Sequence, residues 1–144
     1  MTMKNLIAIL FIALAFVTLI LITAIVSVRT EALEEKAIRT DEAIVGALQT
    51  GMADRLSTFF APDVTFFIPG HPTSNDSAEA TRLVRGFMSA HPVQSFEKKS
   101  MLPGSAPSLS YLKGILHTTD DDFALYATIY NGRIERFDLN EEKK

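Results

Sequence analysis

The feature that most constrains this chain is an unbroken apolar run near its start. The run extends from Leu6 to Val28, 23 residues relieved only by the hydroxyl groups of Thr18, Thr23 and Ser27. As a helix rising about 1.5 Å per residue it would measure about 34 Å, which exceeds the roughly 30 Å hydrocarbon core of a bilayer. The sequence therefore predicts a membrane-spanning segment between Leu6 and Val28.

Two interpretations of this segment are open, a retained anchor and a cleaved secretory signal. A signal peptide has a charged start, about 7 to 15 apolar residues and a small-x-small cleavage site. Lys4 supplies the charged start, but the apolar run is longer than that, and residues 24–29 (AIVSVR) offer no convincing pair of small residues. We therefore predict a transmembrane anchor over residues 1–29 and one domain over residues 30–144.

The charges that flank the apolar run bear on its orientation. Lys4 lies on one side, and Arg29, Lys36 and Arg39 lie on the other, so counting Lys and Arg alone would place the large domain inside the cell. Against that count, the start resembles an export signal, and four glutamates within residues 31–42 dilute the basic flank. We predict a single-pass protein of the bacterial cytoplasmic (inner) membrane, with its C-terminal domain in the periplasm.

The part that follows the apolar run has the size of one domain. About 115 residues suit a single core. The sequence has no cysteine, which excludes disulfides, thiolate metal sites and a cysteine nucleophile. All 17 acidic and 13 of the 14 basic residues belong to this part, so its net charge is about -4. A mildly acidic domain without a basic stripe is poorly suited to nucleic acid, and we predict no nucleic-acid partner.

The first half of the domain is typical of helices. Residues 29–49 are rich in Ala, Glu, Leu and Lys with apolar positions at near-helical spacing, and the segment could continue directly from the membrane helix. Thr50-Gly51 ends it. Residues 54–60 predict a short second helix that stops before Pro62. Residues 64–69 predict a strand by their β-branched and aromatic content.

After a loop, an Asp76 or Ser77 cap predicts a third helix that ends near Ala90, before His91-Pro92. The pattern then changes to strands. Asn131-Gly132 lies between two apolar and aromatic runs and predicts a tight hairpin, because both central residues of that turn need positive φ. Helices followed by an antiparallel meander make an α+β domain. The four predicted strands are residues 94–101, 109–118, 122–130 and 133–140.

Five short motifs accompany this order of elements. They are Phe59-Phe60, Pro69-Gly70, the stretch from Phe87 to Phe96 (FMSAHPVQSF), the spaced residues Tyr111, Gly114, Leu116 and Thr118, and the charged end from Phe137 to Glu141. With them the sequence resembles the nuclear transport factor two-like (cystatin-like cone) superfamily, and within it an exported Bacteroidetes family of unknown function. The resemblance implies three helices packed on a curved antiparallel sheet, and it covers roughly residues 41–142. Its motifs mark the fold and no chemistry.

Enzymes of the wider superfamily often carry Asp-His or Tyr-Asp pairs inside the cone, so Tyr111 and His117 are candidates for a ligand pocket. They share strand phase and would face a ligand if that face lines the cone; a surface location is the alternative. Asp63 is more simply a turn residue, His71 a solvated loop residue and His91 a helix-end residue. We expect no cofactor and no metal, because no ligand spacing is present.

A surface is the other candidate. In residues 123–130 alternate positions are fully apolar, and the remaining ones carry Tyr126 and Tyr130 between small neighbours. The second set makes an outward face more apolar than solvation requires, and tyrosine is favoured at interfaces. Tyr126 and Tyr130 are therefore candidates for a partner surface, with scattered surface tyrosines as the plain alternative.

Together these observations predict a membrane-anchored, non-enzymatic accessory domain of a bacterial envelope complex. Its partner would be another envelope protein or a second copy of the chain. The alternative is a small-ligand-binding or enzymatic cone with a pocket near Tyr111 and His117. An enzyme needs a deep cavity with convergent polar groups. We instead expect a cone filled by apolar side chains, with these phenylalanines near the helical layer: Phe59, Phe60, Phe66, Phe67 and Phe87.

Overall fold

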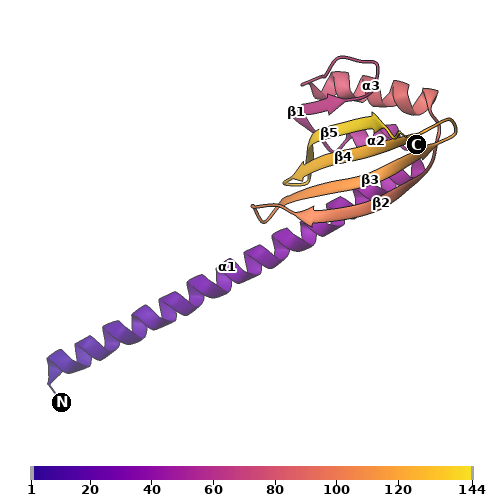
Figure 1. The fold of residues 1–144 in the computed structure, drawn as a ribbon. Coiled ribbons are helices and arrows are strands. Elements are labelled where there is room, and N and C mark those ends of the chain that lie inside the picture. Colours follow the sequence, from indigo (N-terminus) through magenta and orange to yellow (C-terminus); the bar gives the residue numbers. More distant parts are fainter. Residues whose placement is uncertain (1, 144) are drawn as a thin grey trace. The chain divides into compact units, whose positions relative to one another are not determined.

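The computed structural model describes residues 2–143 of the chain. Its contacts divide the chain into two compact units, residues 1–35 and residues 36–144. Helix α1 runs through the first unit into the second. The elements are α1 (Met3–Thr50), α2 (Ala53–Ser57), β1 (Phe60–Phe67), α3 (Ser77–Ala90), β2 (Val93–Pro103), β3 (Leu109–Thr118), β4 (Asp122–Tyr130) and β5 (Arg133–Glu141) (Figure 1).

The first unit is an apolar helix with its side chains exposed. By length and composition α1 could cross a membrane, a test that a signal sequence near the start of a chain also passes. The hydroxyls within the apolar run are satisfied internally, since Thr18 Oγ1 and Ser27 Oγ each donate to the carbonyl four residues earlier, at 2.8 and 2.9 Å. This helix therefore presents no unpaired hydroxyl at Thr18 or Ser27, as a lipid environment requires.

The end of α1 is set by Gly51, as predicted. Gly51 has φ +64°, its N–H donates to the Leu48 carbonyl, and the Met52 N–H donates to the Ala47 carbonyl. These two bonds close the helix in the arrangement that requires a left-handed residue just after the last turn, which glycine adopts at the lowest steric cost. The helix therefore ends at Thr50-Gly51 because of the backbone conformation of Gly51, which the sequence predicts.

The second unit contains one five-stranded sheet in the order β1-β5-β4-β3-β2. Strands β2 to β5 form the predicted antiparallel meander, and Asn131 and Gly132 both have positive φ in the β4–β5 turn, which confirms the hairpin. The sheet is mixed, however, because β1 pairs with β5 in parallel. The prediction of a wholly antiparallel sheet was wrong: no hairpin joins β1 to β5, and hydropathy carries no information on direction for strands so distant in sequence.

Strand β1 also begins earlier than predicted. The second helix ends at Ser57, and β1 includes Pro62, which was expected to lie outside any element. The register of β1 against β5 shifts between Phe60 and Thr65, so Pro62 lies in an irregular stretch of an edge strand. A proline, which has no N–H to donate, is tolerated at such a position.

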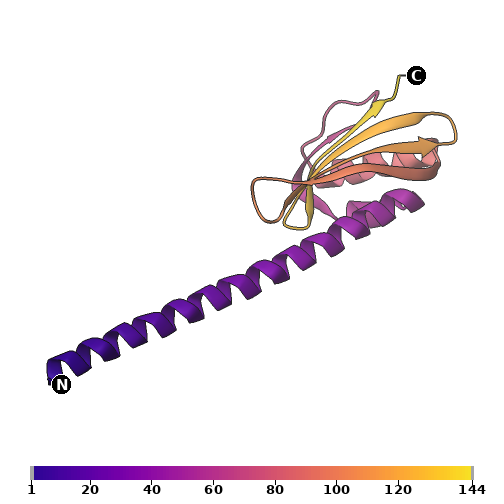
Figure 2. The same cartoon turned by 60° about the horizontal axis from the view of Figure 1, so that its bottom comes forward.

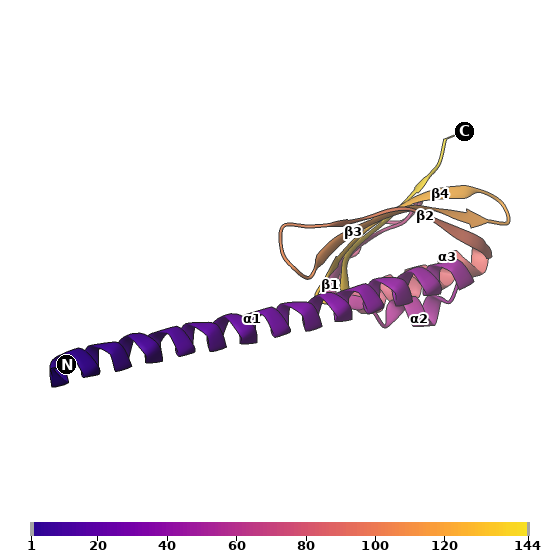
Figure 3. The same cartoon turned by 90° about the horizontal axis from the view of Figure 1, so that it is seen from below.

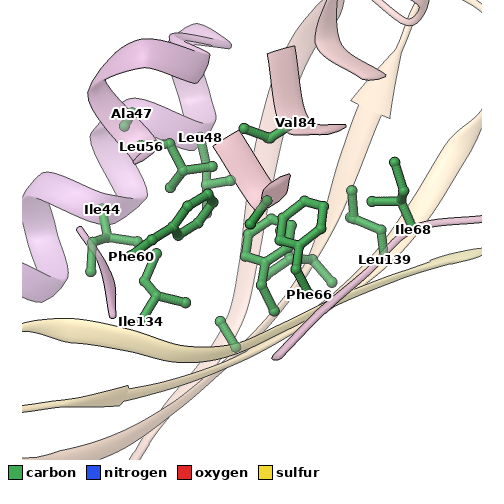
Figure 4. Close-up of a cluster of buried hydrophobic side chains, with 14 of the residues drawn as sticks. Ile44, Ala47, Leu48, Leu56, Phe60, Phe66, Ile68, Val84, Ile134 and Leu139 are labelled. Atoms are coloured by element: carbon green, nitrogen blue, oxygen red, sulfur yellow. The ribbon is translucent and has the colours of Figure 1, made fainter. Parts of the chain in front are cut away.

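The core lies between the sheet and the helices, and Figure 3 shows α2, α3 and the end of α1 on the same side of the sheet. Phe66 and Phe137 stack with ring centroids 5.1 Å apart. The Phe60 ring meets Phe66 edge-on at 5.6 Å, and Figure 4 shows these two rings among the buried side chains. Phe60, Phe66 and Phe87 are buried as expected, but Phe59 and Phe67 are only half-buried. Phe67 faces away from the core because the alternation of β1 assigns the inner face to Phe66.

Gly114 shows how closely β2 and β3 pack. A Cβ at Gly114 would lie 2.4 Å from Phe96 Cζ and 2.5 Å from the carbonyl oxygen of Glu97. Phe96 is buried and covers the space above the glycine. Packing therefore requires the Gly114 of the spaced motif that begins at Tyr111.

Candidate functional site

Strand β3 decides where the predicted pocket residues lie. Leu112 and Leu116 are buried in the core, so the alternate positions Tyr111 and His117 face the opposite side of the sheet. Tyr111 is 45 % exposed there. Of the two locations considered for Tyr111 and His117, the structure therefore shows the surface location, because Leu112 and Leu116 occupy the inward positions of β3.

The tyrosines of β4 face outward as predicted. Phe123, Leu125, Ala127 and Ile129 are buried, whereas Tyr126 and Tyr130 are 44 % and 40 % exposed. The register places Tyr111 opposite Thr128, between these two tyrosines, and Leu102 of β2 opposite Tyr111. We call this set the tyrosine face; it consists of Leu102, Tyr111, Tyr126 and Tyr130, and Figure 2 shows the curved sheet that carries it.

The tyrosine face is bordered by charge. Lys113, directly opposite Tyr126 in the ladder, holds its ammonium nitrogen 5.5 Å from the centre of the Tyr126 ring. Such cation–π contacts orient an exposed ring at modest gain, about 0.5–1 kcal/mol. The Lys113 ammonium group therefore orients the exposed Tyr126 ring only weakly.

His117 lies at the far end of the same sheet face in a cluster of carboxylates. Its Nδ1 is 2.8 Å from Asp122 Oδ1, and its Nε2 is 3.5 Å from Glu97 Oε2. The hydrogen bond to Asp122 raises the pKa of His117, with a smaller contribution in the same direction from Glu97. The two carboxylates thus favour the charged imidazolium, and they occupy both of its ring nitrogens in structural ion pairs.

A groove of about 360 Å³ lies between the last turns of α1 and strand β2. Its walls combine apolar and polar side chains, which are Ile38, Asp41, Glu42, Val45, Gln49, Lys98 and Met101. Asp41 is half-buried, and both of its carboxylate oxygens accept from Ser110 Oγ, at 3.1 and 3.3 Å.

Burial raises the pKa of Asp41, while the hydrogen bond from Ser110 and the charge of Lys98 oppose the rise. A carboxyl with a raised pKa in a groove is the arrangement that general acid–base chemistry uses. Sequence reasoning missed Asp41, since nothing in a helical run rich in Glu and Ala distinguishes one acidic residue. The only available signal was its place on the turn before Ile44, whose face enters the core.

The remaining sequence candidates have structural roles or none. Asp63 is exposed, within β1 and not in a turn, and His71 is exposed in the loop after β1. His91 forms the end of α3, where its ring packs against Phe87 and Phe123 with centroids 4.8 and 5.4 Å away. Within residues 2–143, no group of three His, Cys, Asp or Glu side chains is placed to hold a metal ion.

The fold of the domain, with its helices on one side of a five-stranded sheet, is similar to that of solved nuclear transport factor two-like structures. An NTF-2 like protein of unknown function from Burkholderia xenovorans has TM-score 0.57 at 15 % identity, covering 77 % of this chain and 88 % of its own. A DUF4783 protein from Bacteroides uniformis has TM-score 0.63 at 20 % identity, covering 72 % of this chain and 97 % of its own.

The family model described as "Domain of unknown function (DUF4783)" matches residues 41–136, and the chain belongs to this family. No curated protein matches the chain. A proposed ketosteroid isomerase from Kribbella flavida is also similar in fold, with TM-score 0.53 at 14 % identity, covering 76 % of this chain and 82 % of its own. At such identities the likeness concerns the fold alone, so the resemblance predicted from the sequence is confirmed and the activity stays open.

Proposed function

We propose that the chain is a membrane-anchored, non-enzymatic accessory domain of a bacterial envelope complex, which binds a protein partner through its tyrosine face. The observation that carries the proposal is the exposure of three tyrosines and Leu102 on one side of a sheet whose other side already has a complete core. Tyrosine supplies large contact area with few rotatable bonds, and it is enriched among the residues that dominate binding energy.

The anchor part of the proposal rests on the length of Leu6 to Val28 and on its internally bonded hydroxyls. The site of action would be the cytoplasmic membrane, with the domain in the periplasm. Alkaline carbonate washing of membranes should leave the protein in the pellet, and intact mass should include the residues before Arg29. A mature protein that starts after Ser27 would instead identify the segment as a cleaved signal.

The partner would be another envelope protein or a second copy of the chain. The test uses the full chain, solubilised from its native membrane in detergent, and records what co-elutes with Tyr126→Ala, Tyr130→Ala and Tyr111→Ala variants. Each tyrosine removed should weaken association by about 1–3 kcal/mol if it anchors the interface. His71→Ala is the matched control, because His71 is exposed but lies outside the tyrosine face. Association that survives all three changes would exclude this face.

A second function is favoured by the Asp41 groove. A half-buried carboxyl with a raised pKa, apolar walls and a nearby lysine could bind a small ligand or act in acid–base catalysis. The alternative of a ligand-binding or enzymatic cone therefore moves from Tyr111 and His117 to Asp41. Asp41→Asn should abolish ligand binding or turnover with the tyrosine face intact, whereas the accessory function predicts that this variant still associates normally.

A further inference from the structure

A third polar site lies at the edge of the sheet formed by β1 and β5, away from the Asp41 groove. It is a groove of about 300 Å³, near the lower end of the roughly 300–1,000 Å³ range of ligand pockets. Five of its six lining residues are polar and one is aromatic. They are Thr65, Phe67, Thr73, Arg136, Asp138 and Asn140.

The parallel register of β1 and β5 builds the floor of this groove. Thr65 is paired with Arg136 and Phe67 with Asp138, while Phe66 and Phe137 between them point into the core. Alternation along both strands therefore presents a hydroxyl, an aromatic ring, a guanidinium and a carboxylate on one side of the sheet.

The loop after β1 forms the wall. Ser74 pairs with Phe66, its N–H donating to the Phe66 carbonyl at 2.9 Å and its carbonyl accepting from the Phe66 N–H at 2.8 Å. Thr65 Oγ1 lies 3.3 Å from Asn75 Oδ1, which fixes the loop a second time. Because Ser74 occupies the edge of β1 at this point, an extended peptide cannot add to the strand there.

The charged pair in the groove is arranged for hydrogen bonding. Arg136 Nε donates to Asp138 Oδ2 at 2.6 Å, and the Arg136 side chain is 61 % exposed, which leaves its terminal N–H groups turned to solvent. Asp138 Oδ1 is enclosed and has no hydrogen-bond partner within the described residues. A buried acceptor of this kind is costly. Because Oδ1 is enclosed, Oδ2 is the oxygen of Asp138 that a ligand in the groove can reach.

The composition of the lining selects among ligand classes. One cation and one anion neutralise each other, and no further basic residue lines the groove, which disfavours phosphate or carboxylate ligands. A single half-buried ring is too little for an apolar ligand. Hydroxyl, amide, guanidinium and carboxylate groups beside one aromatic ring match a molecule that has many hydroxyls and one C–H face.

We propose that the groove between β1, β5 and the loop at residues 70–76 binds a neutral saccharide. One sugar ring packs its C–H surface against Phe67, and its hydroxyl groups hydrogen-bond to Arg136, Asp138 and Asn140. None of the groove residues belongs to the tyrosine face or to the apolar helix, although the groove adjoins the tyrosine face, because Asp138 is paired with Tyr126.

The test uses the full chain in lipid nanodiscs and saturation-transfer difference NMR with four neutral probes: the methyl glycosides of glucose, galactose, mannose and N-acetylglucosamine. At least one probe should receive saturation, above the level given by empty nanodiscs. Arg136→Ala and Phe67→Leu should each weaken binding about tenfold or more, since each removes a principal contact.

The controls are matched by residue type. Arg133→Ala removes another exposed arginine of β5 that lies outside the groove, and Phe59→Leu removes another half-buried phenylalanine; both should bind like the wild type. Circular dichroism and thermal unfolding verify that each variant is folded. Saturation of none of the four probes overturns the proposal, as does equal weakening by the controls. Binding of inorganic phosphate alone, lost in Arg136→Ala, would assign an anion site instead and would also overturn it.

Discussion

The two faces of the sheet differ in how closely their side chains are packed, although successive residues of each strand point to the two faces in turn. On the inner face Leu112, Leu125 and Phe137 are fully enclosed, whereas on the outer face Tyr111 and Tyr126 keep nearly half of their surface exposed. The inner face is specified by volume, because close packing tolerates neither a void nor an added atom. Side chains on the outer face do not have to fill a core, so packing does not explain the tyrosines there. We propose that they bind a partner.

We expect the largest loss of stability from a substitution on the inner face. Phe137→Ala removes a ring that stacks on Phe66 and should lower the free energy of unfolding by about 3–5 kcal/mol. Tyr126→Ala on the outer face should lower it by about 1 kcal/mol or less, because its ring is partly solvated. Urea unfolding of residues 30–144 measures both, since every buried apolar residue of the described chain lies at Ile44 or later. Similar losses of unfolding free energy in the two variants would contradict the difference in packing between the two faces.

We expect the next largest loss of stability from a substitution at Gly114. Gly114→Ala should destabilise the domain by about 1–3 kcal/mol, because the new methyl group collides with Phe96 and with the Glu97 backbone. The double variant Gly114→Ala with Phe96→Leu removes part of the ring and should recover some of the loss. A neutral effect of Gly114→Ala would mean that β2 and β3 pack less closely than described. Gly86→Ala is the control, since a Cβ there meets nothing within 4 Å.

The half-buried carboxyl of Asp41 should make the stability of the domain depend on pH. Because its pKa is raised in the folded state, that state binds the proton more tightly than the unfolded chain, so Asp41 stabilises the domain at low pH and loses this contribution as pH rises through its folded pKa. Asp41→Asn should therefore raise stability at pH 7, by less than about 1 kcal/mol given partial solvation. The difference should vanish in acid, as measured by urea midpoints across pH. A loss of stability at pH 7 would contradict the stated cause of the shift.

We expect the smallest change in stability from a substitution of His117 on the outer face. Its pKa is raised, so its ion pairs stabilise the domain fully below the unfolded value of about 6.5, and this gain is lost as pH rises through the folded pKa. His117→Gln should cost well under about 1 kcal/mol below pH 6 and nothing at pH 9. NMR titration of the imidazole measures the pKa directly. A value at or below that of an unfolded histidine would exclude the proposed pairing with Asp122.

Much of the architecture was predictable because its causes are local. Gly51 ends α1 and Asn131-Gly132 turns the hairpin for reasons of backbone conformation that involve only a few residues. Asp76 caps α3 by accepting from the Ala78 and Glu79 N–H groups, as the residue type predicted. The outward direction of Tyr126 and Tyr130 also followed from alternation, since the opposite positions are entirely apolar.

The candidate sites were less predictable, because each needs residues from distant segments. In β3 both alternating sets contain apolar residues, so the pocket placement of Tyr111 and His117 could not be decided before the core was known. Asp41 becomes distinctive only when Ser110 and Lys98 approach it. The groove at Arg136 depends on the parallel pairing of β1 with β5, which hydropathy does not report.

The sequence by itself therefore determined the apolar helix, the ends of α1 and α3, the β4–β5 turn and the order of elements, because short-range conformational preferences and hydropathy periods decide them. Only the tertiary structure decided the direction of β1, the phase of β3 and the neighbours of Asp41 and Arg136. Strand pairing and burial are collective: a strand takes its partner and its inward face from how all the apolar side chains fill one core, and no single segment encodes that choice.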